Sequence, residues 1–506
     1  MAKGNVNSAM KLLTNNMSNG ILPLGEDTLH QLRMKHPASR NADNDILLQG
    51  EIPDIHPIIF EEIDEEMVKQ AALKTRGGSG PSGMDADGWR KILVSNHYGA
   101  TGADLRRAFA EMIKKMCTEK EEPRNGTTSL ESFLACRLIP LDKNPGLRPI
   151  GVGEVLRRIA GKVVMKIVKE SAGGLQMCGG HEAGAEAAIH AMHDIYDMNE
   201  TEAVLLVDAE NAFNSVNRKA LLHNIRYLCP AFCTFVYNCY SAPSRLFVIG
   251  GFELKSEEGT TQGDPSAMAT YSLALVPLIN ALIQLENSAL QVTFADDITG
   301  AGLLEQLLIW WTKLLEYGPK LGYFPKAAKS FIIVKEEHLE RAQQMFADTG
   351  INITSAGKRH LGAVIGSHEY KQEYVNNSID EWIKELRVLT EIAETQPQAA
   401  YAAYIHGFKH KLTYMLRTVP NITNELKRVE AVVRNEFLPA ITGGHQCSNE
   451  ERKLLALPVK LGGLGIDEVD KISIYEYEAS RKITKSLVDN IKAQNNDIPD
   501  DLVEQV

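Results

Sequence analysis

The sequence predicts an α+β protein, in which short strands and helices alternate as far as about residue 370 and helices follow. A strand–turn–strand pattern spans 136–150, where Asn-Pro-Gly supplies the turn. Short apolar runs at 203–207 and 331–334 have the length of buried strands. Beyond residue 371, apolar residues recur at the i, i+3, i+4 spacing of amphipathic helices in three segments: 374–393, 399–417 and 422–437.

The composition is that of a globular protein with enough chain for a large core: 506 residues, 44% hydrophobic and 24% charged. The formal net charge of −11 excludes a uniformly basic nucleic-acid coat, but it is compatible with a local basic channel. The start lacks an apolar signal core, and the longest apolar run, 272–285, is too short and too polar to span a bilayer. We therefore expect an intracellular protein, in the cytoplasm or the nucleus, with no membrane partner.

The first 75 residues look loosely organised and are interpreted as an N-terminal extension. A segment rich in glycine and proline follows at 76–85. It lacks the Lys-Ser/Thr that ends a phosphate-binding P-loop, so a connecting loop is the simpler interpretation.

Positive charge is concentrated around the 136–150 hairpin. Lys143 and Arg148 flank its turn, and a predicted helix over 155–169 carries further cations, which are Arg157, Arg158, Lys162, Lys166 and Lys169. Phosphate binding would explain both sets. A solvated helix face explains the helical cations almost as well, but it does not explain Arg148, which stands between two apolar residues.

Two further stretches place polar residues where a strand ends or a helix begins. The apolar run 203–207 ends on Asp208, a common position for a metal ligand, with a helix cap as the ordinary alternative. Gln262-Gly263-Asp264-Pro265 precedes a long apolar helix over 266–285, with the proline in its first turn.

The segment 292–299 is an apolar, strand-like run that contains two adjacent acids, Asp296 and Asp297. Like charges repel each other, and burial favours the neutral form of a carboxyl group. Two arrangements relieve this conflict: the acids sit on an exposed hairpin turn, or a divalent cation holds them.

Taken in order, these blocks resemble the reverse transcriptases, most closely those of non-LTR retrotransposons. The resemblance covers about 76–370, and it is specific because five short blocks occur in the family's order. They are Lys143 with Leu147-Arg148-Pro149-Ile150; Asp208-Ala209-Glu210-Asn211-Ala212-Phe213; Gln262-Gly263-Asp264-Pro265; Phe294-Ala295-Asp296-Asp297; and Lys329-Ser330 followed by Leu361-Gly362. The chain departs from the family at Phe294, where Tyr is frequent, and at Lys326, where Asn is usual; neither position holds a metal ligand.

The resemblance implies a right-hand polymerase fold with fingers, palm and thumb. Fingers and palm would lie within 76–370, with the palm formed by an antiparallel sheet that carries the three acids. A helical thumb and C-terminal region would occupy 371–506 and hold the template–primer duplex. The implied activity is that of an RNA-directed DNA polymerase, a nucleotidyltransferase that extends a DNA or RNA primer on an RNA template with dNTPs.

The family's chemistry implies a metal site built on the acids. Two divalent ions, Mg²⁺ or Mn²⁺, stabilise the attacking and leaving oxygens of the phosphoryl transfer, and such hard ions favour carboxylate oxygens. By resemblance, Asp208, Asp296 and Asp297 would be the catalytic carboxylates and metal ligands, and the backbone carbonyl of Ala209 would be a further ligand.

Six matches concern the incoming nucleotide: Lys143, Arg148, Phe213, Gln262, Gly263 and Lys329. The first two would neutralise the triphosphate, and the Gln-Gly pair would line the nucleotide and template pocket. Phe213 stands where the family places a steric gate against ribonucleotides, with a plain core aromatic as the alternative. Lys329 matches a lysine near the leaving pyrophosphate, with a surface salt bridge as the alternative. Leu361 and Gly362 match the turn that positions the primer end.

Two other classes of function remain open. RNA-dependent RNA polymerases share the palm and the metals, but they usually carry Gly before the Asp pair and a smaller sugar pocket, so Ala295 and Phe213 argue against them. The other class is a non-catalytic nucleic-acid-binding protein derived from a retroelement. Decay would normally remove the acids first, and all three acids are present.

Overall fold

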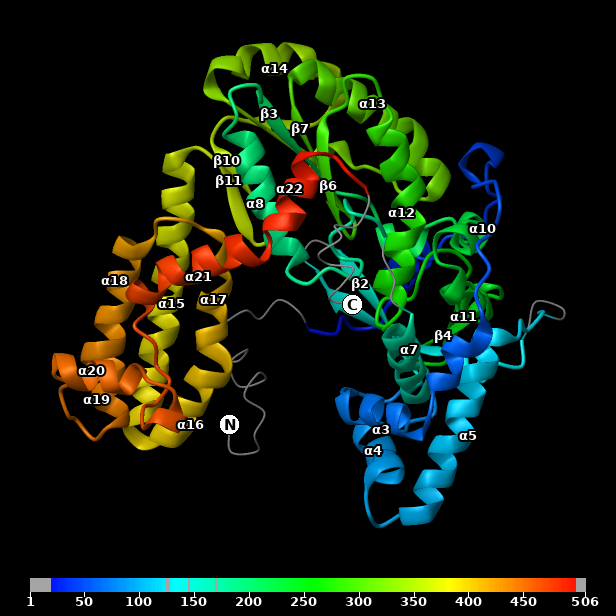
Figure 1. Ribbon diagram of the computed structural model, residues 1–506, viewed down its shortest axis with the longest axis horizontal. Helices are drawn as coiled ribbons and strands as arrows, with labels where there is room; N and C mark the ends of the chain where they lie inside the picture. Colours follow the sequence, from blue (N-terminus) through cyan, green and yellow to red (C-terminus); the bar gives the residue numbers. More distant parts are fainter. Residues whose placement is uncertain (1–19, 124–127, 144–145, 169–171, 497–506) are drawn as a thin grey trace.

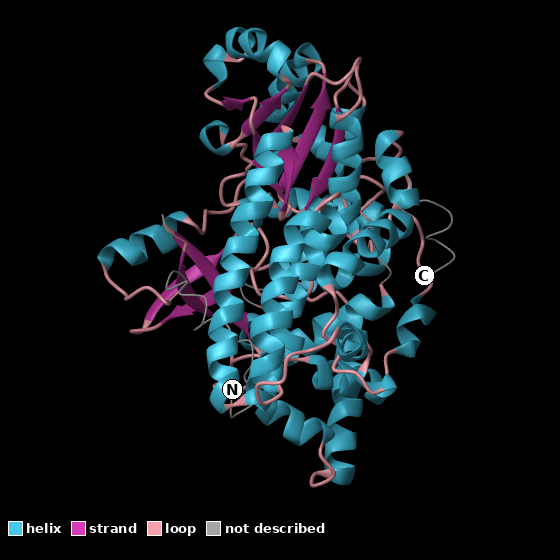
Figure 2. Ribbon diagram, turned by 90° about the vertical axis from the view of Figure 1, so that its left-hand side faces the viewer, coloured by secondary structure: helices cyan, strands magenta, loops and turns pink. Residues whose placement is uncertain are grey.

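The computed structural model describes residues 20–123, 128–143, 146–168 and 172–496. Within them the chain forms two β-sheets, a separate hairpin and many helices (Figure 1), so the predicted α+β class is confirmed. Figure 2 shows the two sheets at separate places, with helices between and around them. The predicted turn residues Asn144 and Pro145, and the predicted helix end at Lys169, lie outside the described residues.

A five-stranded sheet has the strand order β6-β7-β3-β8-β9. Its strands are β3 (Ala203–Val207), β6 (Leu290–Phe294), β7 (Asp297–Gly302), β8 (Phe331–Val334) and β9 (Asn352–Thr354). The pairings β6-β7, β7-β3 and β3-β8 are antiparallel, whereas β8 and β9 are parallel. The expectation of a wholly antiparallel sheet is therefore wrong at this edge, because α14 (Leu339–Met345) lies between β8 and β9 and allows the crossover that a parallel pair requires.

Helices cover both faces of this sheet, which explains why β3 is apolar at every position. One layer contains α12 (Ala267–Ile283) and α13 (Leu304–Leu321), and the other contains α8 (Gly184–Tyr196) and α22 (Lys485–Lys492). Leu205 and Val207 belong to the core of the first layer, and the alternate residues Val204 and Leu206 pack in that of the second. Figure 1 shows α8 and α12 on opposite sides of β6.

A four-stranded sheet has the order β2-β1-β4-β5. Its strands are β1 (Cys136–Asp142), β2 (Leu147–Gly153), β4 (Ser244–Val248) and β5 (Phe252–Ser256). The first two form the predicted hairpin, in which Leu141 pairs with Arg148. This register places Arg148 and Lys143 at the same end of the hairpin.

Helices surround this second sheet and connect it to the first. They are α2 (Glu26–Met34), α3 (Glu65–Lys74), α4 (Ala86–Val94), α5 (Gly99–Thr118), α6 (Glu131–Leu134), α7 (Val155–Ile167), α9 (Ala212–Ser215), α10 (Arg218–Leu228) and α11 (Pro230–Tyr240). Val68 of α3 shares a buried core with Ile113 of α5 and Ile159 of α7. Residues before 76 thus pack with those after it, and the domain boundary at 75 stays a prediction.

The C-terminal region is helical, as the sequence predicts. Its helices are α15 (His368–Thr395), α16 (Pro397–Ala403), α17 (Lys409–Thr418), α18 (Thr423–Val432), α19 (Leu438–Ile441), α20 (Asn449–Ala456) and α21 (Val469–Ile483). Two π-helical turns, Tyr404–Phe408 and Val433–Phe437, interrupt the predicted helices, which periodicity alone does not reveal. No helix in the described ranges is long and apolar enough to cross a membrane.

The segment 357–366 forms a separate hairpin, with β10 (Gly357–His360) and β11 (Ala363–Gly366) joined by Leu361 and Gly362. Both turn residues have positive φ, 46° and 84°, as two-residue hairpin turns require. The Leu-Gly pair therefore reverses the chain.

Candidate active site

The adjacent acids lie at a two-residue turn between β6 and β7. Phe294 pairs with Asp297, so Ala295 and Asp296 are the central residues of this turn. Ala295 has a φ of 56°, a left-handed conformation that is unfavourable for a residue with a side chain. The hairpin turn is therefore confirmed, although Asp296 is not exposed in it and Asp297 is the first residue of β7. It does not compete with the metal interpretation, because Asp296 is half-buried and lines a cavity.

Two buried side chains from elsewhere in the chain hold this turn. Gln176, which is fully buried, accepts a hydrogen bond from Ala295 N at 3.0 Å and donates one to the Ala295 carbonyl at 3.4 Å. The Tyr323 hydroxyl donates to the carbonyl of Asp296 at 2.9 Å. Because these bonds satisfy backbone groups of the turn itself, they offset the strain at Ala295.

Asp208 reaches the same end of the sheet from β3. Val207 pairs with Ile298, so the next residues outward on the two strands, Asp208 and Asp297, are neighbours. The helix-cap alternative for Asp208 is wrong, since Asn211 occupies the N-cap of α9.

The three carboxyl groups act on one another electrostatically. Burial of the carboxyl group, then the charges of Asp296 and Asp208, raise the pKa of Asp297 to about 7, although this residue is open to solvent on one side. Burial and the charge of Asp208 raise the pKa of Asp296, while the positive charges of Lys143 and Arg148 act to lower it. Concentrated negative charge of this kind favours a bound cation.

The donor set fits a hard divalent cation, since Mg²⁺ prefers carboxylate and carbonyl oxygens. Two hydrogen bonds join the backbone around Ala209 to the backbone around Pro325. They use the Asp208 carbonyl and the Glu210 N–H, so neither uses the Ala209 carbonyl, the predicted metal ligand. Across the described residues, however, no group of three or more His, Cys, Asp or Glu side chains is arranged to hold a metal ion. The metal therefore stays a prediction.

One cavity of about 550 Å³ gathers residues from six separate stretches of the sequence. The predicted site residues that line it are Lys143, Arg148, Ala209, Phe213, Gln262, Gly263, Asp296 and Lys329. Asp208 and Asp297 do not line the cavity, but each is the chain neighbour of a residue that does, Ala209 and Asp296 respectively. The cavity thus brings an acidic end and a cationic side into one space.

Exposed cations supply that cationic side. Lys143 and Arg148 come from the β1-β2 hairpin, and Lys329 comes from the short helix that precedes β8. A surface salt bridge is the alternative role for Lys329. The structure gives such a salt bridge to its neighbour Lys326, whose ammonium pairs with Glu210 at 2.8 Å.

The cations of α7 have a different use. Arg157 is buried and pairs with Asp264 at 2.6 Å, and Arg158 and Lys162 donate to backbone carbonyls within 74–78. Phosphate binding and a solvated face are therefore both wrong for Arg157, whereas for the partly exposed Arg158 and Lys162 phosphate binding stays a prediction. Burial and hydrogen bonding tie the helix to the loop at 76–85, and Lys166 alone among the described cations of α7 is exposed.

Phe213 is half-buried between the cavity and the core behind it. Its ring stacks on Tyr271 with 4.3 Å between ring centroids, and its carbonyl accepts a hydrogen bond from Thr260 N at 2.6 Å. Tyr271 is fully buried, and its hydroxyl has no hydrogen-bond partner among the described atoms. Phe213 is thus a supported wall of the cavity as well as a core residue.

The loop that carries Gln262 and Gly263 is fixed against β2. The N–H of Gly151 donates to the Gln262 carbonyl at 2.9 Å. Gly263 has a φ of 112°, and a Cβ there would lie 2.6 Å from the Gly151 carbonyl oxygen. Only glycine fits this close approach.

Leu361 and Gly362 do not line this cavity. Gly362 borders a separate groove of about 560 Å³ between the β10-β11 hairpin and helices α15 and α17. The Tyr414 hydroxyl donates to the Leu361 carbonyl at 2.6 Å, and the Tyr374 hydroxyl donates to the Gly362 carbonyl at 2.9 Å.

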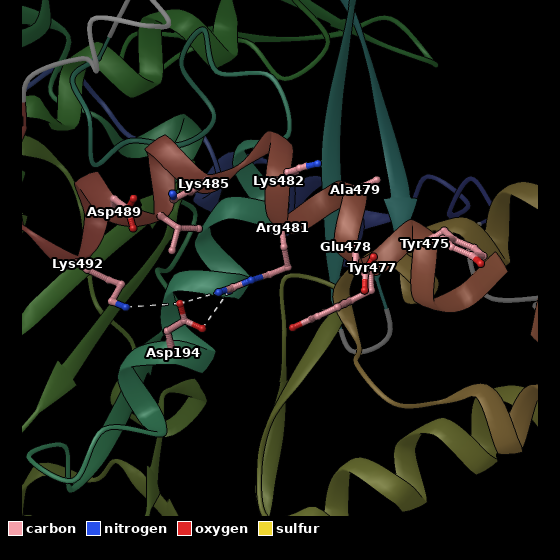
Figure 3. Close-up of a pocket in the computed structure, with 11 residues that line it drawn as sticks. Asp194, Tyr475, Tyr477, Glu478, Ala479, Arg481, Lys482, Lys485, Asp489 and Lys492 are labelled. Atoms are coloured by element: carbon pink, nitrogen blue, oxygen red, sulfur yellow. Dashed lines mark hydrogen bonds and ion pairs between the residues drawn. The ribbon is translucent and has the colours of Figure 1, made fainter. Parts of the chain in front are cut away.

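A larger cavity, about 720 Å³, lies between α8 and the C-terminal helices α21 and α22 (Figure 3). Arg481 reaches across it to Asp194 with hydrogen bonds of 3.0 Å, and Lys492 lies 3.6 Å from the same carboxylate. None of the predicted site residues lines it. Convergence of the sequence blocks, rather than size, therefore identifies the candidate site.

Several residues that shape the site have no signal in the sequence pattern. Gln31 and Lys35 line the cavity from α2, and Gln176, Tyr271 and Tyr323 support its walls. The N-terminal pair lies more than a hundred residues from the nearest block, and no spacing pattern connects them. The tyrosines occur in apolar segments that predict only core positions.

Comparisons with known proteins give a distant link. No protein-family model matches the chain. The "Retrotransposable element SLACS 132 kDa protein" of Trypanosoma brucei gambiense is 21% identical over 448 residues, which cover 82% of this chain and 34% of that protein. The chain thus spans about a third of the length of this relative.

Proposed function

We propose that this chain is an RNA-directed DNA polymerase of a retroelement, which extends a primer 3′-hydroxyl with dNTPs on an RNA template. One observation carries the proposal: a single cavity gathers parts that act on a nucleotide. They are an acid of the adjacent pair, three exposed cations, the aromatic ring of Phe213, and the loop that Gly263 fixes against β2. Each of these parts has a role in the proposed synthesis of DNA from dNTPs. The distant similarity to a retrotransposable-element protein supports a mobile-element origin.

The proposal assigns right-hand regions to the fold. The five-stranded sheet with Asp208, Asp296 and Asp297 is the palm. The four-stranded sheet with its helices supplies the fingers, and the helices from residue 371 supply the thumb.

The acids give the site its metal-dependent chemistry. Asp208, Asp296, Asp297 and the Ala209 carbonyl would hold Mg²⁺ or Mn²⁺. Two such ions, when bound, stabilise the attacking and leaving oxygens of an in-line displacement. The stiff turn held by Gln176 keeps the carboxylates positioned before substrate arrives.

The cations and the aromatic wall select the substrate. Lys143, Arg148 and Lys329 neutralise the triphosphate, and the guanidinium does so with forked hydrogen bonds. Phe213, stacked on Tyr271, cannot yield easily to a ribose 2′-hydroxyl. The proposal therefore includes selection of deoxynucleotides.

The test is primer extension on an RNA template with a DNA primer, with dNTPs or rNTPs, in Mg²⁺ or in EDTA. We expect extension with dNTPs alone, abolished by EDTA. Phe213→Val should raise incorporation of rNTPs while Phe346→Val, a buried aromatic away from the cavity, should not. Extension with rNTPs by the unaltered protein would make it an RNA polymerase, and RNA binding without any extension would make it a non-catalytic binding protein.

A further inference from the structure

The N-terminal segment, residues 20–48, is anchored at two walls of the site and lines the cavity with Gln31 and Lys35. At its start, Leu22 N donates to the Pro140 carbonyl of β1. At its end, Leu48 N donates to the side chain of Asn224 in α10 at 2.9 Å. The segment thus joins the sheet that carries Lys143 and Arg148 to the chain that follows Asp208.

Helix α2 has one face for packing and another for the cavity. Leu29 and Leu32 are buried in a core with Leu147 of β2. Gln31 and Lys35 are four residues apart, so they share another face, and both line the cavity.

The backbone at Lys35 is fixed beside the acidic end of the cavity. The Asn211 side chain donates to the Lys35 carbonyl at 2.9 Å. Five residues later, the Arg40 guanidinium donates to the Ser215 carbonyl at 2.8 Å, and Arg40 N donates to Glu258 at 2.6 Å. These bonds hold the lysine in place without using its ammonium group.

The Lys35 ammonium is surrounded by like charges. Burial lowers its pKa, and so do the charges of Lys143, Lys329 and Lys326, while Glu210 acts in the opposite direction. Glu210 is already paired with Lys326. Among the described residues, no ion pair joins Lys35 to a carboxylate, so the cavity offers unneutralised positive charge that a polyanion would stabilise.

We propose that Lys35 is a triphosphate-binding residue, which completes a group of four cations with Lys143, Arg148 and Lys329. This inference rests on the proposed function and extends the substrate site into the N-terminal segment. The cavity also contains the sugar wall Phe213 and an acid of the catalytic turn, so its ligand is the incoming nucleotide rather than the template or primer backbone.

The binding test uses inorganic tripolyphosphate, with and without Mg²⁺, and follows the melting temperature of the full chain. We expect Lys35→Gln to raise the apparent Kd about tenfold, as loss of one charge-assisted hydrogen bond predicts, and Lys35→Arg to restore it. The matched control is Arg33→Gln, which removes one charge from an exposed residue of the same helix that does not line the cavity; its Kd should not change.

Three results would overturn the inference. The first is an unchanged Kd for tripolyphosphate in Lys35→Gln. The second is an equal loss of ligand-free stability and of binding in both Lys35 variants, which would make the residue structural, and the third is an equal loss of RNA affinity, which would assign the residue to binding a nucleic-acid backbone.

The kinetic test keeps the inference separate from the proposed function. In primer extension, Lys35→Gln should raise the KM for dNTP about tenfold with a smaller change in kcat. If the unaltered protein does not extend primers, the proposed polymerase is contradicted, and the tripolyphosphate measurement still decides the role of Lys35.

Discussion

Two tight turns of this protein use the same device in different surroundings. The acid turn (residues 294–297) and the leucine turn (residues 360–363) each place a non-glycine residue at positive φ, Ala295 at 56° and Leu361 at 46°. In each, a tyrosine hydroxyl donates to a carbonyl of the turn. Both conformations are strained, and both persist because surrounding side chains determine them.

The surroundings differ in where the supporting side chains originate. Gln176 and Tyr323 come from segments next to the five-stranded sheet. The acid turn is therefore fixed to the same sheet whose strand β3 leads to Asp208. Tyr374 and Tyr414 come from α15 and α17, so the leucine turn is fixed to the C-terminal helices. The comparison teaches that the acid turn is held without side chains of α15 or α17, whereas the leucine turn is hydrogen-bonded by both.

The largest effect should come from Gln176→Ala. This change removes both Gln176 bonds to Ala295. The N–H keeps the Cys178 sulfur as an acceptor at 3.2 Å, but the buried carbonyl loses its partner, which costs about 1–3 kcal/mol of unfolding free energy. Single-nucleotide incorporation should fall about a hundredfold or more, because the carboxylates lose their fixed geometry. Urea unfolding and rapid-quench kinetics measure the two quantities. Gln343→Ala, at an exposed position of α14, is the control, and wild-type incorporation by Gln176→Ala would show that the turn needs no such support.

The next effect should come from the double change Tyr374→Phe with Tyr414→Phe. It removes two hydroxyl bonds from the leucine turn, each worth about 1 kcal/mol. We expect about tenfold weaker use of the primer–template, with the KM for dNTP unchanged. Tyr475→Phe, where the side chain is 72% exposed, is the matched control. A raised KM for dNTP with normal primer use would assign the leucine turn to the nucleotide instead.

Tyr323→Phe should have a smaller effect, and it should act on nucleotide incorporation rather than on use of the primer–template. One hydrogen bond to Asp296 is lost while both Gln176 bonds remain, so incorporation should slow about fivefold. Use of the primer–template should not change. If primer use changed and incorporation did not, the two turns would not be held independently.

The smallest effect should be the pH dependence of stability that His360 contributes beside the leucine turn. Burial, then the charge of His193, lower the pKa of His360 to about 3, and His193 bonds the Val364 carbonyl at 2.7 Å. The unfolded chain therefore binds a proton near its usual pKa of about 6.5 while the folded chain does not. The contribution of neutral His360 to the free energy of unfolding is fully present above about pH 6.5, and it is lost as the pH falls below that value. Urea unfolding at pH 7.5 and 5.5 should show a smaller loss in His360→Asn than in the unaltered protein, and an equal loss would remove His360 from this account.

Local patterns predicted most of the elements. The hairpin at 136–150, the β8 strand and the helical C-terminal region follow from turn chemistry and hydrophobic period. The parallel pairing of β9 did not follow, because strand direction depends on the crossover through α14 rather than on the strand's own residues.

The site was predictable where one short block carries the chemistry. Asp296, Arg148 and the Gln262-Gly263 loop were assigned by type and order, and the structure brings them together in one cavity. Lys35 and Gln176 were missed because their roles depend on contacts with distant segments. Arg157 was misread for the same reason: its partner Asp264 fixes it in the core, and charge alone cannot reveal that.

The most direct test of the central claim compares Asp296→Asn with Asp348→Asn in single-nucleotide incorporation and in RNA binding. Both changes remove one carboxylate charge, but Asp348 is exposed and does not line the cavity. The account predicts that Asp296→Asn abolishes incorporation while RNA binding and folding remain, and that Asp348→Asn changes nothing. Incorporation at the normal rate by Asp296→Asn would contradict the account, because the cavity would then not be the place where the nucleotide reacts.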